Sequence, residues 1–472
     1  MKSLLLDFLK GKSLELKRPV NISLLGFGST NRAFLELLLP LDNVKISVRQ
    51  MGIAKEDFPD SVTVYNCENA FSELYEDVII PSPSVRREKL IIPRHAEVIT
   101  DYDLLFREEN KRMFLVSGSD GKSTTTALAS LMLRDGIPTL FTGGNLGTPL
   151  ILASKDSEAF LLELSSFTLR YSQPKFARAL LTNVTPNHLD WHGSIDEYIE
   201  TKLALIRHSD EPILNLGDPI SKAEAGHCSS FCLISTCLTH RDITARYKTE
   251  HTVTLAGEKI LLDGKEVIPL SEIKRNEKHN ISNFCSAIAI SIGYADRAHI
   301  MTVAREFNGL YERCERFTVD EVEYISSSID TTPERTRITL EGIGKEVSII
   351  LGGRGKQLPL DPLRSPLIKY AKKISLYGDM TDELLGFINS DEQLSKIPHR
   401  SFAKLCEAID YAIDDLKPGD TVLLSPAATS YGEFESYIQR GRFFKDYIST
   451  KHKKCNKTKK IYDQCTKETE KK

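Results

Sequence analysis

The sequence predicts an α/β protein with three domains, each built around a mainly parallel sheet. Its 472 residues are too many for one ordinary hydrophobic core, so two or three domains are expected. Three successive series of short apolar strands alternate with helical stretches, as βαβ units do. In each series a glycine-rich turn follows a strand, a pattern typical of proteins that bind nucleotides.

The first series opens with a strand at 20–28 and continues through 44–48 to a strand within 76–84. Helical stretches separate these strands, which predicts an N-terminal domain over residues 1–109. The N-terminus, MKSLLLDFLKGK, has an apolar run that Asp7 interrupts and no small-residue cleavage site. We therefore expect neither a signal peptide nor a membrane span there.

The second and third series predict a central and a C-terminal domain over residues 110–309 and 310–455. The apolar strands of these series lie at 159–164, 177–184, 212–216, 345–353, 372–378 and 421–426. Residues 251–267 instead alternate apolar and polar side chains around Gly257, which predicts a small β-hairpin region in the central domain. We expect the lysine-rich tail, 456–472, to be disordered.

Composition excludes several classes of protein. The net charge is −3, which gives no electrostatic reason to expect a nucleic-acid partner. The nine cysteines are odd in number and form no C-x-x-C pair, which favours reduced thiols in a cytoplasm.

The turn in 114-FLVSGSDGKSTTT-126 fits phosphate binding. Gly118 and Gly121 let backbone N–H groups curl around an anion, and the following helix adds its positive end. Lys122 would bring a charge to the terminal phosphates, and Ser123 would bring a hydroxyl to Mg²⁺. A plain strand–turn–helix corner is the alternative interpretation.

Polar residues also follow two other strands of the central domain. Glu163 ends an apolar strand, where a buried carboxylate is costly without a partner such as Mg²⁺. A surface glutamate at a strand edge is the alternative. The loop 182-TNVTPNHLDWHG-193 brings His188, Asp190 and His192 together, which suits a metal or phosphate role about as well as a structural one.

The first domain carries half of a dinucleotide fingerprint. Gly26 and Gly28 in 24-LLGFGSTNRAF-34 end its first strand, but Asn31 holds the third glycine position, so the match to an NAD site is weak. Arg49, at the tip of the second strand, could meet a polar ring or a phosphate, although a surface arginine is the default.

Weaker signals lie further along the chain. Asn280 and Asn283 begin a helix, where they would cap it or bond a nucleotide base. The turn 351-LGGRGKQLPL-360 supplies cations, and 423-LLSPAATSYGEFESYIQRG-441 places small and hydroxyl residues at a helix start, which suits a carboxylate. By its spacing alone, Lys202 is an ordinary helical lysine.

Taken together, these motifs resemble those of the Mur ligases of peptidoglycan synthesis, and most of all the members that add D-glutamate. The ordered matches are GSDGKST, GGNLGTPL, LELSSF, TNVTPNHLD, HNISN, GLYERCE, TTPERT, LGGRGK and SPAATSYGEFESYIQRG. The resemblance implies a Rossmann-like UDP-binding domain, a P-loop ATPase domain and a Rossmann-like C-terminal domain that closes over the amino acid. ATP would phosphorylate the carboxylate of UDP-N-acetylmuramoyl-L-alanine, and the amine of D-glutamate would attack the acyl phosphate.

The resemblance also implies roles for individual residues. The catalytic residues would be Lys122, Glu163, His188 and Lys202. ATP would contact Gly118, Ser119, Asp120, Gly121, Lys122, Ser123, Thr124, Asn280, Asn283 and Arg313. The UDP-substrate would contact Gly28, Ser29, Thr30, Arg49, Ser82, Asn145, Ser165 and Phe167. D-Glutamate would contact Thr331, Lys356, Ser430, Tyr431 and Tyr437, and the metal would contact Ser123, Glu163, His188 and Lys202.

The implied cofactors are ATP and Mg²⁺ at two sites, with a carbamylated lysine at Lys202. Carbamylation would turn a cation into an anion that can lie beside Mg²⁺. The expected partners are small-molecule substrates, with neither nucleic acid nor membrane, and the expected state is a cytoplasmic monomer.

The chain departs from the family pattern at a few positions. Relatives often read Asn-Asp-Ser-Lys-Ala-Thr or Asn-Asp-Ser-Ile-Ala-Thr where this chain has 326-SSSIDT-331. Ser327 thus replaces the acidic residue, and Asp330 replaces an alanine. Glu312 stands where histidine is usual, and Val48-Arg49 where a Thr-Arg pair is common. The phosphate-binding residues are intact.

Three alternatives stay open at this point. A folylpolyglutamate synthetase-like ligase shares the ATPase domain and the modified lysine but lacks the initial UDP-binding domain. An oxidoreductase built on Gly26 and Gly28 has weaker support. A Mur-like regulator that binds nucleotide sugar without catalysis is favoured by Ser327 and opposed by the full set of Lys122, Glu163, His188 and Lys202.

Overall fold

A computed structural model describes residues 1–451 of the chain with short gaps. The gaps are residues 51–57, 68, 84, 88–89, 109–110, 146–147, 173–176, 186–193, 275–277, 311–313, 356–357 and 431, together with the side chains of Ser29, Lys278 and His279. The expected tail at 456–472 lies outside the described residues. The chain divides into two compact units, Met1–Phe307 and Asn308–Lys472.

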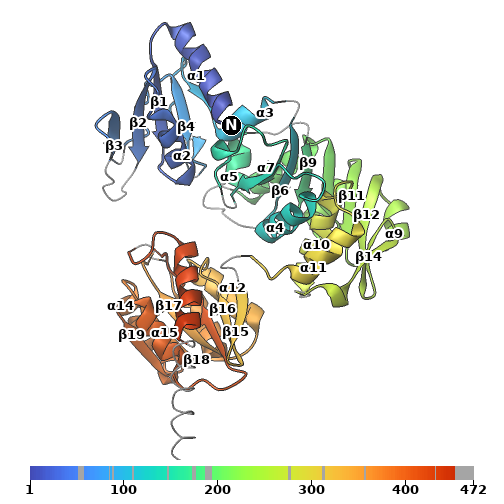
Figure 1. Cartoon of the computed structure of the whole chain (residues 1–472), viewed down its shortest axis with the longest axis vertical. Coiled ribbons are helices and arrows are strands. Elements are labelled where there is room, and N and C mark those ends of the chain that lie inside the picture. Colours follow the sequence, from blue (N-terminus) through green and yellow to red (C-terminus); the bar gives the residue numbers. More distant parts are fainter. Residues whose placement is uncertain are drawn as a thin grey trace, which may run out of the picture. The chain divides into compact units, whose positions relative to one another are not determined.

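The first sheet of the N-terminal unit is parallel and doubly wound (Figure 1). Its strand order is β3-β2-β1-β4-β5. The order reverses between β1 and β4, and open α/β sheets bind ligands at the carboxyl ends of such strands. Its elements are α1 (Lys2–Leu16), β1 (Val20–Leu25), α2 (Ser29–Leu38), β2 (Val44–Gln50), β3 (Val62–Asn66), β4 (Val78–Pro81), β5 (Glu97–Val98) and α3 (Asp101–Phe106).

The second sheet of the same unit has the strand order β14-β13-β12-β11-β10-β9-β6-β8-β7. Its parallel part consists of β6 (Arg112–Ser117), β7 (Leu140–Gly144), β8 (Ala159–Glu163), β9 (Ala177–Leu181), β10 (Glu211–Asn215), β11 (Ser230–Ser235) and β12 (Thr249–Ala256). The last strands, β13 (Lys259–Leu262) and β14 (Lys265–Pro269), extend the sheet through antiparallel pairs. This confirms the predicted hairpin region.

Helices connect the strands of this second sheet and cover it. They are α4 (Lys122–Leu133), α5 (Ser166–Tyr171), α7 (Ile195–Arg207), α8 (Pro219–Ala225), α9 (His240–Thr244), α10 (Lys278–Ile290) and α11 (Arg297–Glu306), with short 3₁₀ turns η2 (Leu150–Leu152) and η3 (Leu270–Glu272). Helix α10 packs against α4, the helix that follows the phosphate loop.

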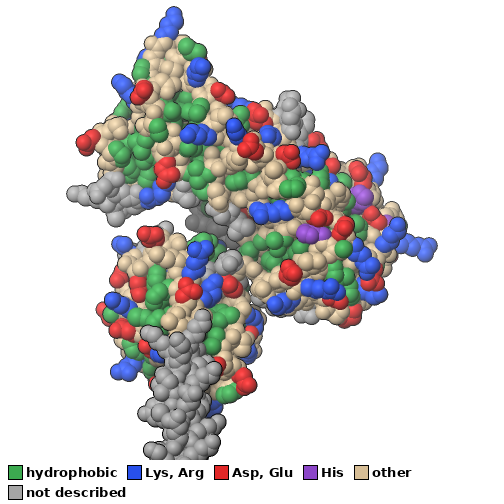
Figure 2. All heavy atoms as spheres, viewed as in Figure 1, with side chains coloured by type: hydrophobic (Ala, Val, Ile, Leu, Met, Phe, Trp, Pro, Cys, Tyr) green, Lys and Arg blue, Asp and Glu red, His purple; other side chains and the backbone are tan. Residues whose placement is uncertain are grey.

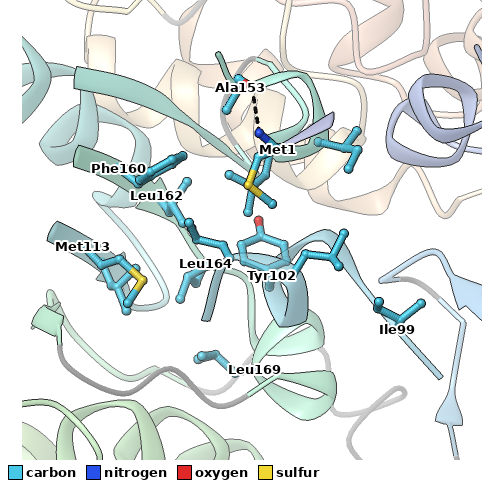
Figure 3. Packing of buried hydrophobic residues seen from close by; sticks show 14 of the residues in the cluster. Met1, Ile99, Tyr102, Met113, Ala153, Phe160, Leu162, Leu164 and Leu169 are labelled. Carbon is cyan, nitrogen blue, oxygen red and sulfur yellow. Dashed lines mark hydrogen bonds between the residues drawn. The ribbon is translucent and has the colours of Figure 1, made fainter. Parts of the chain in front are cut away.

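One hydrophobic core runs through both sheets of the N-terminal unit (Figure 3). Tyr102 of α3 lies in it beside Leu164, which follows β8, and Phe160 of β8 belongs to the same core. Met1 lies in the same core, and its amino group donates a hydrogen bond of 3.2 Å to the carbonyl of Ala153. The two sheets therefore form one compact unit.

A buried arginine fastens α10 to the second sheet. Arg178 of β9 is 8% exposed, and its Nη1 donates to the carbonyls of Ile290 (3.0 Å) and Ile292 (2.7 Å) at the end of α10. Its Nε pairs with Glu211, and its guanidinium lies 4.1 Å from the ring centre of Phe231. The cation therefore satisfies carbonyls that the helix leaves free and opposes the negative end of the helix dipole.

The sheet of the C-terminal unit has the strand order β15-β16-β20-β17-β18-β19 and is parallel except for the β15–β16 hairpin. The carboxyl ends of β16, β20 and β17 are therefore neighbours. The elements are β15 (Glu315–Val319), β16 (Val322–Ser326), α12 (Pro333–Ile343), β17 (Val347–Gly352), α13 (Asp361–Tyr370), β18 (Ala371–Tyr377), α14 (Thr381–Asn389), η4 (Leu394–Lys396), β19 (His399–Phe402), α15 (Leu405–Ile413) and β20 (Thr421–Leu424), and residues 437–451 are helical.

These three sheets confirm the predicted α/β fold class, while the domain boundaries at 109 and 309 stay a prediction. Positive and negative side chains are interspersed over the face shown in Figure 2. Among the described helices, none combines the length and the apolar character needed to cross a membrane.

Replacing Arg178 by alanine should loosen α10. The change leaves carbonyls of the helix end and the Glu211 carboxylate without their partner, so we expect a loss of about 2–3 kcal/mol in unfolding free energy. Hydrogen exchange should accelerate over Lys278–Ile290. Arg207→Ala is the control, because Arg207 is 45% exposed and its ion pairs should contribute at most about 1 kcal/mol. Unchanged exchange in α10 would contradict this role of Arg178.

Candidate functional site

The phosphate loop lies between β6 and α4, and its glycines are required by close contacts. Gly118 has a φ of +145° and Gly121 a φ of +77°, conformations that favour glycine. A Cβ on Gly118 would lie 1.9 Å from Oγ1 of Thr182, and one on Gly121 would lie 2.4 Å from Oδ1 of Asn283. Neighbouring side chains therefore fill the space that a larger residue would need.

The end of the adjacent strand β9 holds the loop in place. The backbone N–H of Ser119 donates to the carbonyl of Asn183, and the N–H of Asp120 donates to its side-chain Oδ1, both at 2.9 Å. Oγ1 of Thr182 donates to the carbonyl of Asp120 at 2.7 Å. These bonds fix the loop before any ligand binds. The N–H groups of Lys122, Ser123 and Thr124 begin α4, and the first N–H groups of a helix lack intrahelical acceptors, which suits them to bind an anion.

Two lysines converge on one carbonyl of this loop. Nζ of Lys122 donates to the carbonyls of Gly118 (2.9 Å) and Ser119 (2.8 Å), and Nζ of Lys202 donates to the same Gly118 carbonyl at 2.7 Å. Lys202 is 1% exposed. Burial, and then the nearby charge of Lys122, lower the pKa of Lys202 well below its usual value. Lys202 is thus a buried site residue, which its sequence spacing did not indicate.

Helix α7 places Lys202 there. The side chain of Ser194 accepts a hydrogen bond from the N–H of Glu197 and caps the start of the helix. Tyr198, one turn before Lys202, is buried on the same face, and its ring centre lies 4.9 Å from Nζ of the lysine. The Tyr198 hydroxyl bonds to Oγ of Ser119 at 2.8 Å, so α7 also contacts the phosphate loop directly.

Glu163 ends β8, the neighbour of β6 on its other side, and its carboxylate is 1% exposed. Nδ2 of Asn145 donates to its Oε1 at 2.9 Å. Among the described residues, the other oxygen, Oε2, is buried without a hydrogen-bond partner. A buried carboxylate oxygen in this state is costly unless a cation approaches it, and Mg²⁺ prefers such ligands.

The residues present fit a magnesium ion that is shared with a phosphate, rather than a cage made by the protein alone. Within the described ranges, no three His, Cys, Asp or Glu side chains gather into a group that could hold a metal ion. Ser123, at the start of α4, Glu163 and Lys202 are the described members of the expected metal set. His188 lies outside the described residues. Mg²⁺ commonly binds through one or two protein ligands and the phosphates of its substrate.

The asparagines of α10 border the phosphate loop. Asn280 and Asn283 are 6% and 7% exposed, and Nδ2 of Asn283 bonds to Oδ1 of Asn280 at 3.4 Å. Oγ1 of Thr125, in α4, donates to Oδ1 of Asn283 at 3.4 Å. Arg313 of the expected ATP set lies outside the described residues.

In the first sheet, the expected UDP-binding residues Gly28 and Ser82 meet at the carboxyl ends of β1 and β4. A Cβ on Gly28 would lie 3.8 Å from Oγ of Ser82, and one on Gly26 would lie 3.2 Å from its Cβ. Nδ2 of Asn31 donates to the carbonyls of Gly26 (2.6 Å) and Ile80 (3.2 Å). The residue at the third glycine position of the fingerprint therefore joins the two strand ends.

Arg49 is a buried ion-pair partner and not a surface arginine. It is 3% exposed, and its Nη2 lies 2.9 Å from Oε1 of Glu76. Its Nη1 donates to the carbonyl of Ala70 at 3.0 Å, and the Tyr65 ring centre lies 4.1 Å from the guanidinium carbon. Its contact with UDP stays a prediction, as does that of the half-buried Thr30 in α2.

The remaining UDP candidates lie on α5, which follows Glu163. Ser165 caps this helix by accepting the N–H of Thr168 at 3.1 Å, and Phe167 is half-buried in its first turn. Tyr171 donates from its hydroxyl to the carbonyl of Val85, three residues after Ser82. Helix α5 of the second sheet is thereby tied to the loop after β4 of the first.

In the C-terminal unit, Thr331 follows β16 and Ser430 follows β20, at neighbouring strand ends. Oγ of Ser328 donates to the carbonyl of Tyr437 at 2.8 Å, which ties the two segments together. Arg440 is fully buried, and its Nη2 donates to the Ser328 carbonyl at 2.7 Å. Lys356 and Tyr431 of the expected set lie outside the described residues.

Sequence reasoning missed the residues that position this machinery. Thr182 and Asn183 stand in a loop that was singled out for its histidines. The available signal was that these two polar residues directly follow the apolar strand β9. Arg440 lies within a recognised motif, but its complete burial has no local signature.

Comparisons with known proteins show which family this chain resembles. Residues 116–291 match the Mur ligase middle domain. The chain is 29% identical over 465 residues to the UDP-N-acetylmuramoylalanine–D-glutamate ligase of Clostridium perfringens, covering 94% of this chain and 98% of that one. It is 31% identical over 389 residues to the enzyme of the same name from Acetivibrio thermocellus, covering 79% and 83%. The solved UDP-N-acetylmuramate-alanine ligase of Thermotoga maritima shares the fold, with a TM-score of 0.56 at 18% identity over 91% of this chain and 100% of that one.

Gly118→Ala should disable the phosphate loop. A methyl group 1.9 Å from Oγ1 of Thr182 would displace that hydroxyl from its bond to Asp120 or shift the loop, and the φ of +145° adds strain. We expect ADP affinity, measured by calorimetric titration, to fall at least about tenfold. Gly257→Ala is the matched control, because Gly257 also has a positive φ of +57° but has no atom within 4 Å of the added carbon. Unchanged ADP affinity in Gly118→Ala would show that the close approach is not needed.

Proposed function

Because the chain belongs to the family of UDP-N-acetylmuramoylalanine–D-glutamate ligases, we propose that it joins D-glutamate to UDP-N-acetylmuramoyl-L-alanine in an ATP-dependent reaction. The observation that carries this proposal is the convergence of Lys122 and Lys202 on the Gly118 carbonyl, in a loop that β9 holds ready for phosphate. A binding protein that performs no phosphoryl transfer has no need for a second, buried lysine at that place.

The reaction has two chemical steps. An oxygen of the substrate carboxylate attacks the terminal phosphorus of ATP, and ADP leaves, which gives an acyl phosphate. The amine of D-glutamate then attacks the acyl carbon, the tetrahedral intermediate collapses with loss of phosphate, and the nitrogen gives up a proton as the amide forms. The N–H groups at the start of α4 and the ammonium of Lys122 would hold the phosphates and offset their developing charge.

Glu163 and Ser123 would hold Mg²⁺ together with the phosphates, and His188 and Lys202 would complete the metal set by family resemblance. The unpartnered, buried Oε2 of Glu163 is the local support for this assignment. Bound Mg²⁺ supplies charge neutralisation for phosphate oxygens. Asn145 would hold the Glu163 carboxylate in a fixed orientation through its bond to Oε1.

Lys202 would act as a carbamate. Its ammonium first loses one proton. The lone pair of the resulting amine then forms a bond to the carbon of CO₂, an electron pair moves onto oxygen, and a second proton leaves Nζ. The modification replaces one of two neighbouring cations at the Gly118 carbonyl with an anion, which removes their repulsion and adds a metal ligand.

The remaining assignments complete the proposal. Asn280, Asn283 and Arg313 would contact adenosine. The residues at the ends of β1, β2 and β4 and on α5 would contact the UDP-substrate, and Thr331, Lys356, Ser430, Tyr431 and Tyr437 would contact D-glutamate. We place the protein in the cytoplasm as a monomer, with domain boundaries near 109 and 309.

The proposal is tested by phosphate release from purified protein with ATP, Mg²⁺, UDP-N-acetylmuramoyl-L-alanine and D-glutamate. Release should require all four components, and mass spectrometry should detect the D-glutamyl product. L-Glutamate and a folate substrate are the controls. Release that does not increase on adding D-glutamate would reject the ligase and favour a nucleotide-sugar-binding regulator, whereas release with the folate substrate would favour the folylpolyglutamate reaction.

Lys202→Ala should lower kcat by about 10²-fold or more, because it removes a charged group from the phosphate site. Acetate should restore part of the activity by filling the vacated space with a carboxylate. Lys202→Met is the matched control, since its side chain occupies that space and should lose activity without being rescued. Full activity of Lys202→Ala without added acid would show that this lysine has no role in the reaction.

A further inference from the structure

The C-terminal unit contains a buried carboxylate that the proposed chemistry does not use. Asp330 is 5% exposed, in the turn that follows β16. Its Oδ2 accepts hydrogen bonds from Oγ of Ser425 and from Oγ1 of Thr339, both at 2.7 Å. None of the described ion pairs includes it. The donors to Oδ2 are hydroxyl groups, and the positive charge of Arg335 is close enough to lower the pKa of the carboxyl.

Asp330 belongs to a short turn with its own backbone bonds. The N–H of Ser327 donates to the carbonyl of Leu424 in β20 at 2.8 Å, and the N–H of Asp330 donates to the carbonyl of Ser327 at 2.9 Å. Thr331, the next residue, donates its N–H to the carbonyl of Ile329 at 2.8 Å. The orientation of Thr331 therefore depends on how this turn is held.

Two side chains hold the turn 327–331 through different partners. Ser328 bonds to the carbonyl of Tyr437 and accepts from the buried Arg440, which fixes the turn to the helical segment after β20. Asp330 bonds to Ser425, the first residue after β20. Ser425 begins the segment that leads to Ser430. Asp330 therefore joins the turn that carries Thr331 to the segment that carries Ser430, and both of these residues are expected to contact the amino acid.

Stability alone does not explain a carboxylate in this position. Burial raises the pKa of the Asp330 carboxyl, and the hydrogen bonds from Ser327, Thr339 and Ser425 oppose that shift. Removing a charge from water is costly, and apolar residues often fill such a site at no loss of stability. A carboxylate does offer several acceptor positions in a fixed plane, so it can orient more than one hydroxyl donor at once.

We propose that Asp330 is a positioning residue for the amino-acid pocket, whose buried carboxylate holds the turn bearing Thr331 against the strand end that leads to Ser430. This proposal rests on the proposed function, because that function assigns Thr331 and Ser430 to D-glutamate. Asp330 does not touch the substrate itself. It sets the spacing between two pocket walls, and misplacement of a bound group by about 1 Å can lower the rate about 10²-fold.

Steady-state kinetics test this role with three variants. Asp330→Ala should raise the KM for D-glutamate about tenfold or more while the KM for ATP stays within about twofold. Asp330→Asn keeps one acceptor oxygen and should show a smaller rise. Ser425→Ala removes one donor and should raise the same KM, and adding it to Asp330→Ala should have little further effect, because the interaction is already lost. Asp361→Asn is the control, since that side chain is 79% exposed.

Hydrogen exchange separates this proposal from the proposed function and from simple unfolding. In Asp330→Ala, protection should fall in both peptides 326–332 and 425–430 and stay unchanged in β17 and β18. That result supports the positioning role even if the wild-type protein shows no turnover with D-glutamate, which would reject only the proposed function. Unchanged protection at 425–430, or a fall spread over the whole unit with no change in the KM for D-glutamate, would overturn the positioning role.

Discussion

The candidate site depends on the close approach of Gly118 to Thr182. Because Gly118 has no Cβ, Oγ1 of Thr182 can occupy the adjacent space and bond to the carbonyl of Asp120. This contact fixes the direction of the Gly118 carbonyl, to which Lys122 and Lys202 both donate. The carboxyl ends of three neighbouring parallel strands, β8, β6 and β9, thus supply the carboxylate, the phosphate loop and its support.

Buried polar groups recur wherever the chain prepares a site. Lys202, Glu163, Asp330 and Arg440 are each at most 5% exposed. Such groups contribute little to net stability, because the free-energy cost of their desolvation offsets the free energy gained from their hydrogen bonds and ion pairs. They do restrict where neighbouring segments can lie, since each has directional bonds to satisfy. The folded protein therefore holds its reactive groups in place at some expense of stability, which is common at functional sites.

Local patterns predicted most of the strands and the phosphate loop, but not the contacts between distant segments. The strand expected at 177–184 is β9, Ala177–Leu181, and the hairpin around Gly257 was evident from alternation and turn residues. In contrast, Arg178 and Lys202 look like ordinary charged residues, because their burial arises only when α10 and α7 pack against the sheet. Asp330 stood out as a departure from its relatives, and its partners Thr339 and Ser425 lie 9 and 95 residues away.

The continuous core of the N-terminal unit has a practical consequence for dividing the chain. A fragment that ends at residue 109 would leave Tyr102 and the apolar side chains around it facing water, since their partners include Phe160 and Leu164 of the second sheet. Exposed apolar surface of that kind promotes aggregation. The junction between Phe307 and Asn308 separates the two compact units instead. The chain is therefore best cut there, and the parts that carry the first and second sheets are best expressed as one piece.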